Sequence, residues 1–212
     1  MNLFLKIKTL VLSSAINFIN GDNYHNASKF FHIYKIWNNI NLDNINGDYI
    51  EFGIFKGKSL LHSVKTYNKL SKKTEKINFY GLDSFEGFPV DNHNFYNKDN
   101  FQVSYNKVSK LFSKYPEVKI SKGFFKDTLK NDEFQNNSYA FVFIDCDIYE
   151  SAVDIFEYVN GKISKGGFLM IDDFTSLDKN GNSIYKAFHE KLNPDEFIYF
   201  TSYSNGQIYR CL

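Results

Sequence analysis

The sequence predicts an α/β fold in which a mainly parallel sheet is covered by helices on both faces. After Gly47, short apolar runs that end at Gly, Asp or Ser alternate with segments of helical length. This alternation is typical of parallel strands that are buried on both sides. The last two runs, EFIYFTS and QIYRCL, are separated by a short turn from Ser204 to Gly206. That spacing favours an antiparallel hairpin at the end of the sheet.

The composition indicates one folded domain with an N-terminal extension. The chain has 212 residues, 43% of them hydrophobic and 18% aromatic, and a net charge of +1, which excludes the disordered class. Its basic residues are dispersed lysines apart from Arg210, so we expect no nucleic-acid partner. The two cysteines, Cys146 and Cys211, form no CxxC pair. We therefore expect no disulfide scaffold, no zinc site and a cytoplasmic location.

Residues 1–46 are expected to form N-terminal helices that cover the site, and residues 47–212 the main domain. The apolar stretch up to Asn20 is interrupted by polar residues, which favours an amphipathic helix over a secretion signal. No window reaches the roughly 18 apolar residues of a membrane span. If the chain leaves this first helix uncovered, we expect a homodimer through it. The apolar residues concerned are Leu3, Leu5, Leu10 and Ile16.

A second helix is predicted in the segment NASKFFHIYKIWNNIN. Its aromatic residues recur at helical spacing and are expected to face the core. They are Phe30, Phe31, Tyr34 and Trp37.

A glycine turn follows the first expected strand. The segment DYIEFGIFKGKSLL contains Glu51, Gly53 and Gly57, with Ser59 at the start of a helix. Glycines allow a ligand to approach the backbone, and a helix start offers free N–H groups to an anion. The pattern lacks the G-x-G-x-x-G spacing of a dinucleotide site. It is typical of a nucleotide-like cofactor site, although an ordinary glycine turn is the alternative.

The next expected strand ends at Asp83, in FYGLDSFEG. The interval from the glycine turn is the one at which an acidic residue commonly contacts ribose hydroxyls. A turn cap is the alternative interpretation. The polar segment from Ser84 to Asn100 is long for a loop and is predicted to be a lid over the site.

Four aspartates end two later strands, in FIDCDIYES and GGFLMIDDF. They are Asp145, Asp147, Asp172 and Asp173. In an open parallel sheet, ligands bind beyond the carboxyl ends of the strands, so these side chains are expected at one edge. Carboxylates this close repel one another unless a cation lies among them, and all-oxygen ligation suits Mg²⁺. The alternative is that one or two of them cap helices or turns.

Five segments of the sequence together resemble the macrocin O-methyltransferase family. They are YIEFGIFKGKS, YGLDSFEGFP, GFFKDTL, FIDCDIYES and GGFLMIDDF. The resemblance extends from about Asp48 to His189. It implies a Rossmann-like class I methyltransferase fold with a seven-stranded sheet. It also implies the cofactors S-adenosylmethionine and Mg²⁺, and a sugar or sugar-nucleotide hydroxyl as the methyl acceptor, in surface-polysaccharide or natural-product assembly.

The resemblance also implies site residues. Seven positions correspond to the cofactor pocket of the family. They are Glu51, Gly53 and Ser59 for the methionine portion, Asp83 and Ser84 for the ribose, and Gly123 and Phe124 for the adenine.

The metal ligands implied by the resemblance are Asp145, Asp172 and Asp173, while Asp147 and Tyr149 are placed on the substrate side. A sugar hydroxyl needs its proton removed or its alkoxide stabilised, so either Asp145 or Asp147 is expected to act as the general base.

Two other classes of function are open at this point. The first is a glycosyltransferase in which Asp145 and Asp147 form a metal-binding D-x-D motif, but this leaves Gly53 and Asp83 unexplained. The second is a non-catalytic subunit, which would be expected to lose some of its acidic strand ends. All of them are present.

Overall fold

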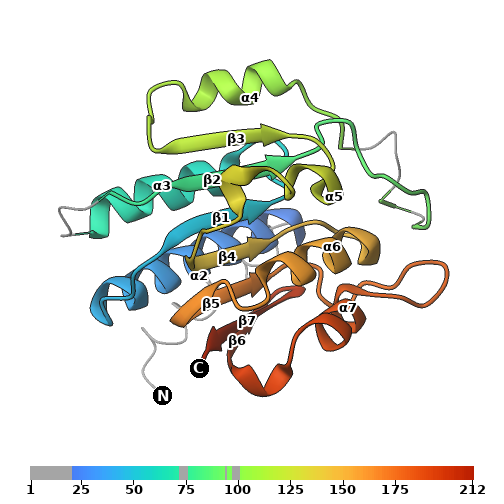
Figure 1. The fold of residues 1–212 in the computed structure, drawn as a ribbon. Coiled ribbons are helices and arrows are strands. Elements are labelled where there is room, and N and C mark those ends of the chain that lie inside the picture. The colour runs from blue at the N-terminus through green and yellow to red at the C-terminus, as the bar shows by residue number, and fades with distance from the viewer. Residues whose placement is uncertain (1–20, 72–75, 94, 97–100) are drawn as a thin grey trace, which may run out of the picture.

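The computed structural model describes residues 21–212 except 72–75, 94 and 97–100. The predicted helix up to Asn20 lies outside the described residues, and with it lie the four apolar residues expected at a dimer contact. The described chain forms one sheet between two layers of helices (Figure 1). In this part of the chain, no helix combines the length and the apolar character needed to cross a membrane.

The sheet has seven strands and confirms the predicted topology. In spatial order they are β3 (Val118–Lys122), β2 (Phe79–Asp83), β1 (Asp48–Phe52), β4 (Tyr139–Ile144), β5 (Ile163–Ile171), β7 (Gly206–Cys211) and β6 (Phe197–Tyr203). The first five are parallel, and β7 is antiparallel to both of its neighbours. The strand order reverses between β1 and β4, which is where open sheets of this kind bind ligands.

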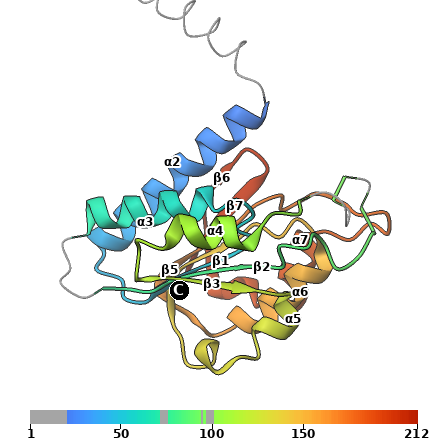
Figure 2. The ribbon, with the colours of Figure 1, turned by 90° about the horizontal axis from the view of Figure 1, so that it is seen from above.

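Three helices cover one face of the sheet: α2 (Gly21–Leu42), α3 (Lys58–Leu70) and α4 (Tyr105–Phe112) (Figure 2). Helix α2 confirms the second predicted helix, but the expected aromatic face is wrong in part, because only Phe30 and Trp37 pack against the core. Phe31 and Tyr34 are 63% and 42% exposed, and Trp37 is the one fully buried member. The sheet contacts mainly a mostly aliphatic stripe at i, i+3, i+4 and i+7, which lies on an adjacent face of the helix and shares Trp37 with the expected set. These residues are Ile33, Ile36, Trp37 and Ile40.

The opposite face is covered by α5 (Phe125–Thr128), α6 (Tyr149–Val159) and α7 (Ile184–Lys191), with two short 3₁₀ helices, Asp132–Phe134 and Pro194–Glu196. All six residues of β4 are buried, as expected for a central parallel strand. Asp145 and Asp147 therefore follow directly after a fully buried strand.

The ends of β1 and β4 lie unusually close together. Gly53 has a φ of +87°, and a Cβ atom there would lie 1.9 Å from the carbonyl oxygen of Asp145. The amide of Asp145 in turn donates to the carbonyl of Phe52. Only glycine fits this approach, so Gly53 is required by the fold independently of any ligand.

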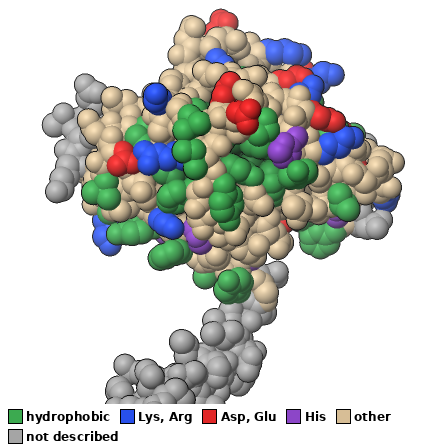
Figure 3. Space-filling view, turned by 90° about the horizontal axis from the view of Figure 1, so that it is seen from below, with side chains coloured by type: hydrophobic (Ala, Val, Ile, Leu, Met, Phe, Trp, Pro, Cys, Tyr) green, Lys and Arg blue, Asp and Glu red, His purple; other side chains and the backbone are tan. Residues whose placement is uncertain are grey.

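Hydrophobic side chains also lie on the surface, interspersed with charged ones (Figure 3). Strand β6 is the edge of the sheet and carries the exposed side chains Ile198 and Tyr199. Phe31 and Tyr34 of α2 are likewise exposed. These side chains are separate from the cavity described next.

Candidate active site

A cavity of about 700 Å³ lies at the carboxyl ends of the central strands. Its wall includes Gly53 after β1, Asp83 at the end of β2, and Asp145 and Asp147 after β4. The size and the position at the reversal of strand order are those of a small-molecule site. Five of the seven predicted cofactor residues line it: Gly53, Asp83, Ser84, Gly123 and Phe124.

Asp83 holds two turns that border the cavity. Its Oδ2 accepts a 2.7 Å hydrogen bond from the amide of Phe55, and its Oδ1 accepts one of the same length from the amide of Phe85. Burial raises the pKa of Asp83, and the two amide hydrogen bonds oppose that rise. The carboxylate therefore caps turns, as the alternative interpretation held, and it also faces the cavity.

The other two predicted cofactor residues lie outside the cavity lining. Glu51 is fully buried and accepts hydrogen bonds from the hydroxyls of Tyr49, at 2.6 Å, and Ser59. Burial raises the pKa of Glu51 to about 7, although both hydrogen bonds oppose the shift. In this arrangement Glu51 ties the first turn of α3 to strand β1, beside the glycine turn.

The described part of the predicted lid covers one side of the cavity. Phe88, Pro89 and Val90 line it. The amide group of Asn92 donates to Glu150 on α6 at 2.7 Å, and the hydroxyl of Tyr96 donates to Asp173 at the same distance. These contacts fasten the segment across the strand ends.

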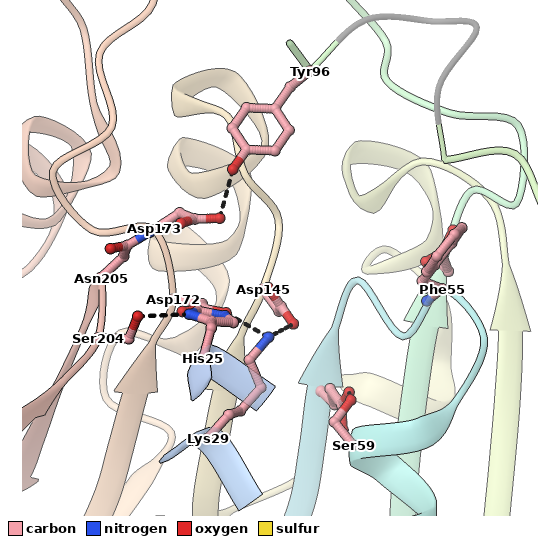
Figure 4. Close-up of polar contacts among 12 residues, drawn as sticks. His25, Lys29, Phe55, Ser59, Tyr96, Asp145, Asp172, Asp173, Ser204 and Asn205 are labelled. Carbon is pink, nitrogen blue, oxygen red and sulfur yellow. Dashed lines mark hydrogen bonds and ion pairs between the residues drawn. The ribbon is translucent and has the colours of Figure 1, made fainter. Parts of the chain in front are cut away.

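The side chain of Lys29 lies between two of the predicted metal ligands (Figure 4). Its Nζ is 2.8 Å from Oδ2 of Asp145 and 2.5 Å from Oδ2 of Asp172. One turn earlier on α2, Nε2 of His25 is 3.0 Å from the same Asp172 oxygen, and the other ring nitrogen is 3.0 Å from the hydroxyl of Ser204. Helix α2 thus brings two basic groups to the acidic strand ends.

These contacts and burial shift the pKa values of Lys29, Asp172 and Asp145 in different ways. Burial alone would favour a neutral amine, but Asp145 and Asp172 raise the pKa of Lys29. Burial also opposes ionisation of Asp172, yet the hydrogen bond from His25 and the charge of Lys29 lower its pKa. For Asp145, burial prevails and its pKa is raised. The site therefore holds Asp172 as the fixed anion beside a charged Lys29.

Asp147 and Asp173 are arranged differently. Asp147 lines the cavity and has a φ of +63°. Burial, together with the nearby carboxylates of Asp145 and Asp173, raises its pKa well above the ordinary value. Asp173 accepts from Tyr96 and, at 3.2 Å, from the side-chain amide of Asn205. Asp172 and Asp173 lie outside the cavity lining.

With Lys29 in place, the three predicted ligands are therefore not arranged to hold one metal ion. Their carboxylate oxygens suit Mg²⁺ chemically, and Oδ1 of Asp172 is buried without a hydrogen bond of normal geometry to any described residue. However, the ammonium of Lys29 lies between Asp145 and Asp172, and Asp173 is turned toward Tyr96 and Asn205. Among the described residues, no three His, Cys, Asp or Glu side chains form a group that could bind a metal.

Sequence reasoning missed the basic partners of the aspartates. His25 and Lys29 are four residues apart and so share one face of a helix. That spacing was a usable signal, but nothing in the sequence placed this face against Asp172. Tyr96 was also missed within the predicted lid. His93, also within the predicted lid, accepts from the amides of Phe95 and Tyr96 and so caps a turn.

Comparison with known proteins agrees with the resemblance seen in the sequence. The macrocin O-methyltransferase (TylF) family model matches residues 26–198. A tetracenomycin-type relative, the 8-demethyl-8-(2,3-dimethoxy-alpha-L-rhamnosyl)-tetracenomycin-C 4'-O-methyltransferase of Streptomyces olivaceus, is 29% identical over 146 residues, which are 62% of this chain and 54% of that protein. The mycinamicin III 3''-O-methyltransferase of Micromonospora griseorubida is 26% identical over 151 residues, 62% of this chain and 57% of that protein. The chain thus spans little more than half the length of these relatives.

Solved structures show the same fold. A calicheamicin methyltransferase superposes with a TM-score of 0.75 at 15% identity, over 96% of this chain and 85% of that one. The O-methyltransferase NovP gives a TM-score of 0.69 at 20% identity, over 87% of this chain and 79% of that one. The sheet order, the C-terminal hairpin and these superpositions are those of a class I methyltransferase fold. The match of the family model over residues 26–198 establishes that the chain belongs to the macrocin O-methyltransferase family.

Proposed function

We propose that this protein transfers a methyl group from S-adenosylmethionine to a hydroxyl of a sugar or a sugar-linked small molecule. The observation that carries the proposal is the cavity, in which Gly53 and Asp83 lie on one side and the acidic ends Asp145 and Asp147 on the other. Such a cavity can hold a nucleoside-type cofactor beside an acceptor hydroxyl. The named relatives support this reading, because both are O-methyltransferases and one acts on a rhamnosyl compound.

The cofactor is assigned to the side formed by β1 and β2. Each oxygen of Asp83 accepts one amide hydrogen bond and keeps a further lone pair for a ribose hydroxyl. Gly53 leaves room for the methionine portion, and Gly123 and Phe124 border the space for the adenine. Glu51 and Ser59 are assigned a supporting role, because they hold the turn from behind.

In the reaction, the acceptor oxygen attacks the sulfonium methyl. A C–O bond forms, the C–S bond breaks, and S-adenosylhomocysteine leaves. We assign the hydroxyl proton to Asp147, because it lines the cavity whereas the Oδ2 of Asp145 is engaged by Lys29. Alignment of the two reactants and exclusion of water by the lid residues Phe88 to Val90 supply further acceleration.

Magnesium dependence stays a prediction from the resemblance, as does a place in polysaccharide or natural-product assembly. The proposed reaction assigns no step to a metal, because the ammonium of Lys29 lies between Asp145 and Asp172, and Asp173 accepts from Tyr96. A glycosyltransferase is not favoured, since that reading leaves the cofactor side of the cavity without a role.

The test is acceptor-dependent transfer of labelled methyl from S-adenosylmethionine to sugar nucleotides and rhamnosyl glycosides, screened with and without added Mg²⁺. We expect Asp147→Asn to lower kcat by about 100-fold or more while S-adenosylhomocysteine still binds. Asp195→Asn makes the same chemical change at an exposed position and should leave kcat unchanged. Failure of the protein to bind either cofactor form would refute the proposal.

A further inference from the structure

Helix α2 places a buried cation where the family resemblance predicts a metal. The side chain of Lys29 is 10% exposed, and that of Asp172 is 1% exposed. The ammonium bridges Oδ2 of Asp145 and Oδ2 of Asp172, which belong to neighbouring strands β4 and β5. In an ion pair this well buried, removing one partner leaves the other charge buried without compensation, which is costly.

We propose that Lys29 is the resident cation of the Asp145–Asp172 pair, and that a divalent cation binds these carboxylates only when Lys29 has left them. The ammonium already contacts one oxygen of each carboxylate. A second cation at the same oxygens would lie within a few ångströms of it, in a poorly hydrated place where repulsion is strong. Occupation by Lys29 and occupation by a metal therefore exclude each other.

The exclusion is coupled to the position of α2. His25 and Lys29 lie one turn apart on this helix, and both contact Asp172. Moving Lys29 away therefore disturbs the hydrogen bonds that fasten the start of α2 to Asp172 and Ser204. Oδ1 of Asp172 is buried without a hydrogen bond of normal geometry to any described residue, although the Tyr203 hydroxyl interacts with this carboxylate, and it offers an incoming cation a first acceptor. Metal loading and docking of α2 thus oppose each other.

Cation binding is measured without catalysis, so the result does not depend on the proposed methyl transfer. Mn²⁺ is titrated into the full chain, with free Mn²⁺ followed by electron paramagnetic resonance. Lys29→Gln removes the charge but keeps a side-chain N–H donor, and we expect it to bind Mn²⁺ about tenfold more tightly than the unchanged protein. Lys35→Gln, on the same helix with its Nζ over the ring of Phe200, should bind like the unchanged protein. Equal affinities in all three proteins, or no binding by a folded Lys29→Gln, would overturn the proposal.

A second measurement uses the unchanged protein and decides the matter if Lys29→Gln does not fold. Amine acylation with mass-spectrometric readout should find Lys29 protected without metal and about fivefold more reactive at high Mn²⁺ concentration. The labelling of Lys35 should not change. If the labelling of Lys29 does not rise at any Mn²⁺ concentration, a metal does not displace it and the proposal is wrong.

Discussion

The two ends of the candidate site are built in different ways. At the cofactor end, Asp83 holds the amides of Phe85, two residues away, and Phe55, 28 residues away. At the acidic end, Asp145 pairs with Lys29 across 116 residues, and Asp172 with His25 across 147. The first end consists of turn contacts at neighbouring strands. The second forms only when α2 has docked on the sheet.

The two ends of the site therefore depend on different parts of the chain. The charge balance of Asp145 and Asp172 rests on side chains from α2, whereas the geometry around Asp83 rests on backbone amides. Changes in α2 should therefore disturb the acidic end and leave the cofactor end intact. Gly53 is the exception, because it joins β1 to the carbonyl of Asp145 and so belongs to both ends.

The largest effect is expected for Gly53→Ala. The new Cβ would lie 1.9 Å from a backbone oxygen, so strands β1 and β4 must separate. We expect the free energy of unfolding to fall by about 5 kcal/mol or more, measured by urea denaturation. Gly161→Ala is the matched control, because Gly161 also has a positive φ, +71°, but faces open space. It should cost about 1 kcal/mol. Similar losses of stability in the two variants would show that glycine is required at position 53 because of backbone strain and not because of the contact with Asp145.

Next in size is Lys29→Met. It leaves the buried carboxylate of Asp172 and the partly buried one of Asp145 without their shared ammonium, and we expect a loss of about 4 kcal/mol in the free energy of unfolding. Lys35→Met should cost about 1 kcal/mol or less, since the Nζ of Lys35 lies over the aromatic ring of Phe200. At a temperature where Lys29→Met is folded, its affinity for S-adenosylhomocysteine should stay within about threefold of the original. A large loss of that affinity would mean that the two ends are not separable.

A pH dependence is expected from Glu51 at the cofactor end. Its pKa is about 7 in the folded protein against 4.5 for an exposed carboxyl. Between these values the folded state binds a proton that the unfolded state lacks, so this contribution to stability is lost as pH rises. The loss amounts to about 3 kcal/mol at most. In Glu51→Gln the contribution is absent, so the variant should gain stability relative to the original protein between pH 5 and about pH 7.5. Urea denaturation at a series of pH values checks this, and a constant difference between the two proteins would contradict it.

The smallest effect is expected for Tyr96→Phe. The variant loses the hydrogen bond to Asp173 that fastens the lid segment, which is worth about 1 kcal/mol. Amide hydrogen exchange in residues 84–93 should become about fivefold faster. Tyr24→Phe, at an exposed position on α2, is the control and should leave exchange in these residues unchanged. Unaltered exchange in Tyr96→Phe would show that the other contacts hold the lid.

The sequence predicted the sheet and much of the cofactor end because both follow from local patterns. Apolar runs, most of them ending at Gly, Asp or Ser, located the strands of the sheet, and the interval between Gly53 and Asp83 placed two residues on one cavity. It did not predict the partners of Asp172. Lys29 and His25 contact Asp172 only because of the way α2 packs on the sheet. The sequence did not predict this packing, and for the same reason the expected aromatic face of α2 was misplaced. Register between a helix and a sheet depends on packing that periodicity alone does not specify.

The central claim is that the cofactor binds at the Asp83 end and not at the acidic end. The most direct measurement is isothermal titration of S-adenosylhomocysteine into the original protein, Asp83→Asn and Asp172→Asn, each first shown to be folded by circular dichroism. We predict that Asp83→Asn weakens binding about 30-fold, because a charged hydrogen-bond acceptor is lost, and that Asp172→Asn stays within about threefold. Loss of binding in Asp172→Asn with normal binding in Asp83→Asn would contradict the account.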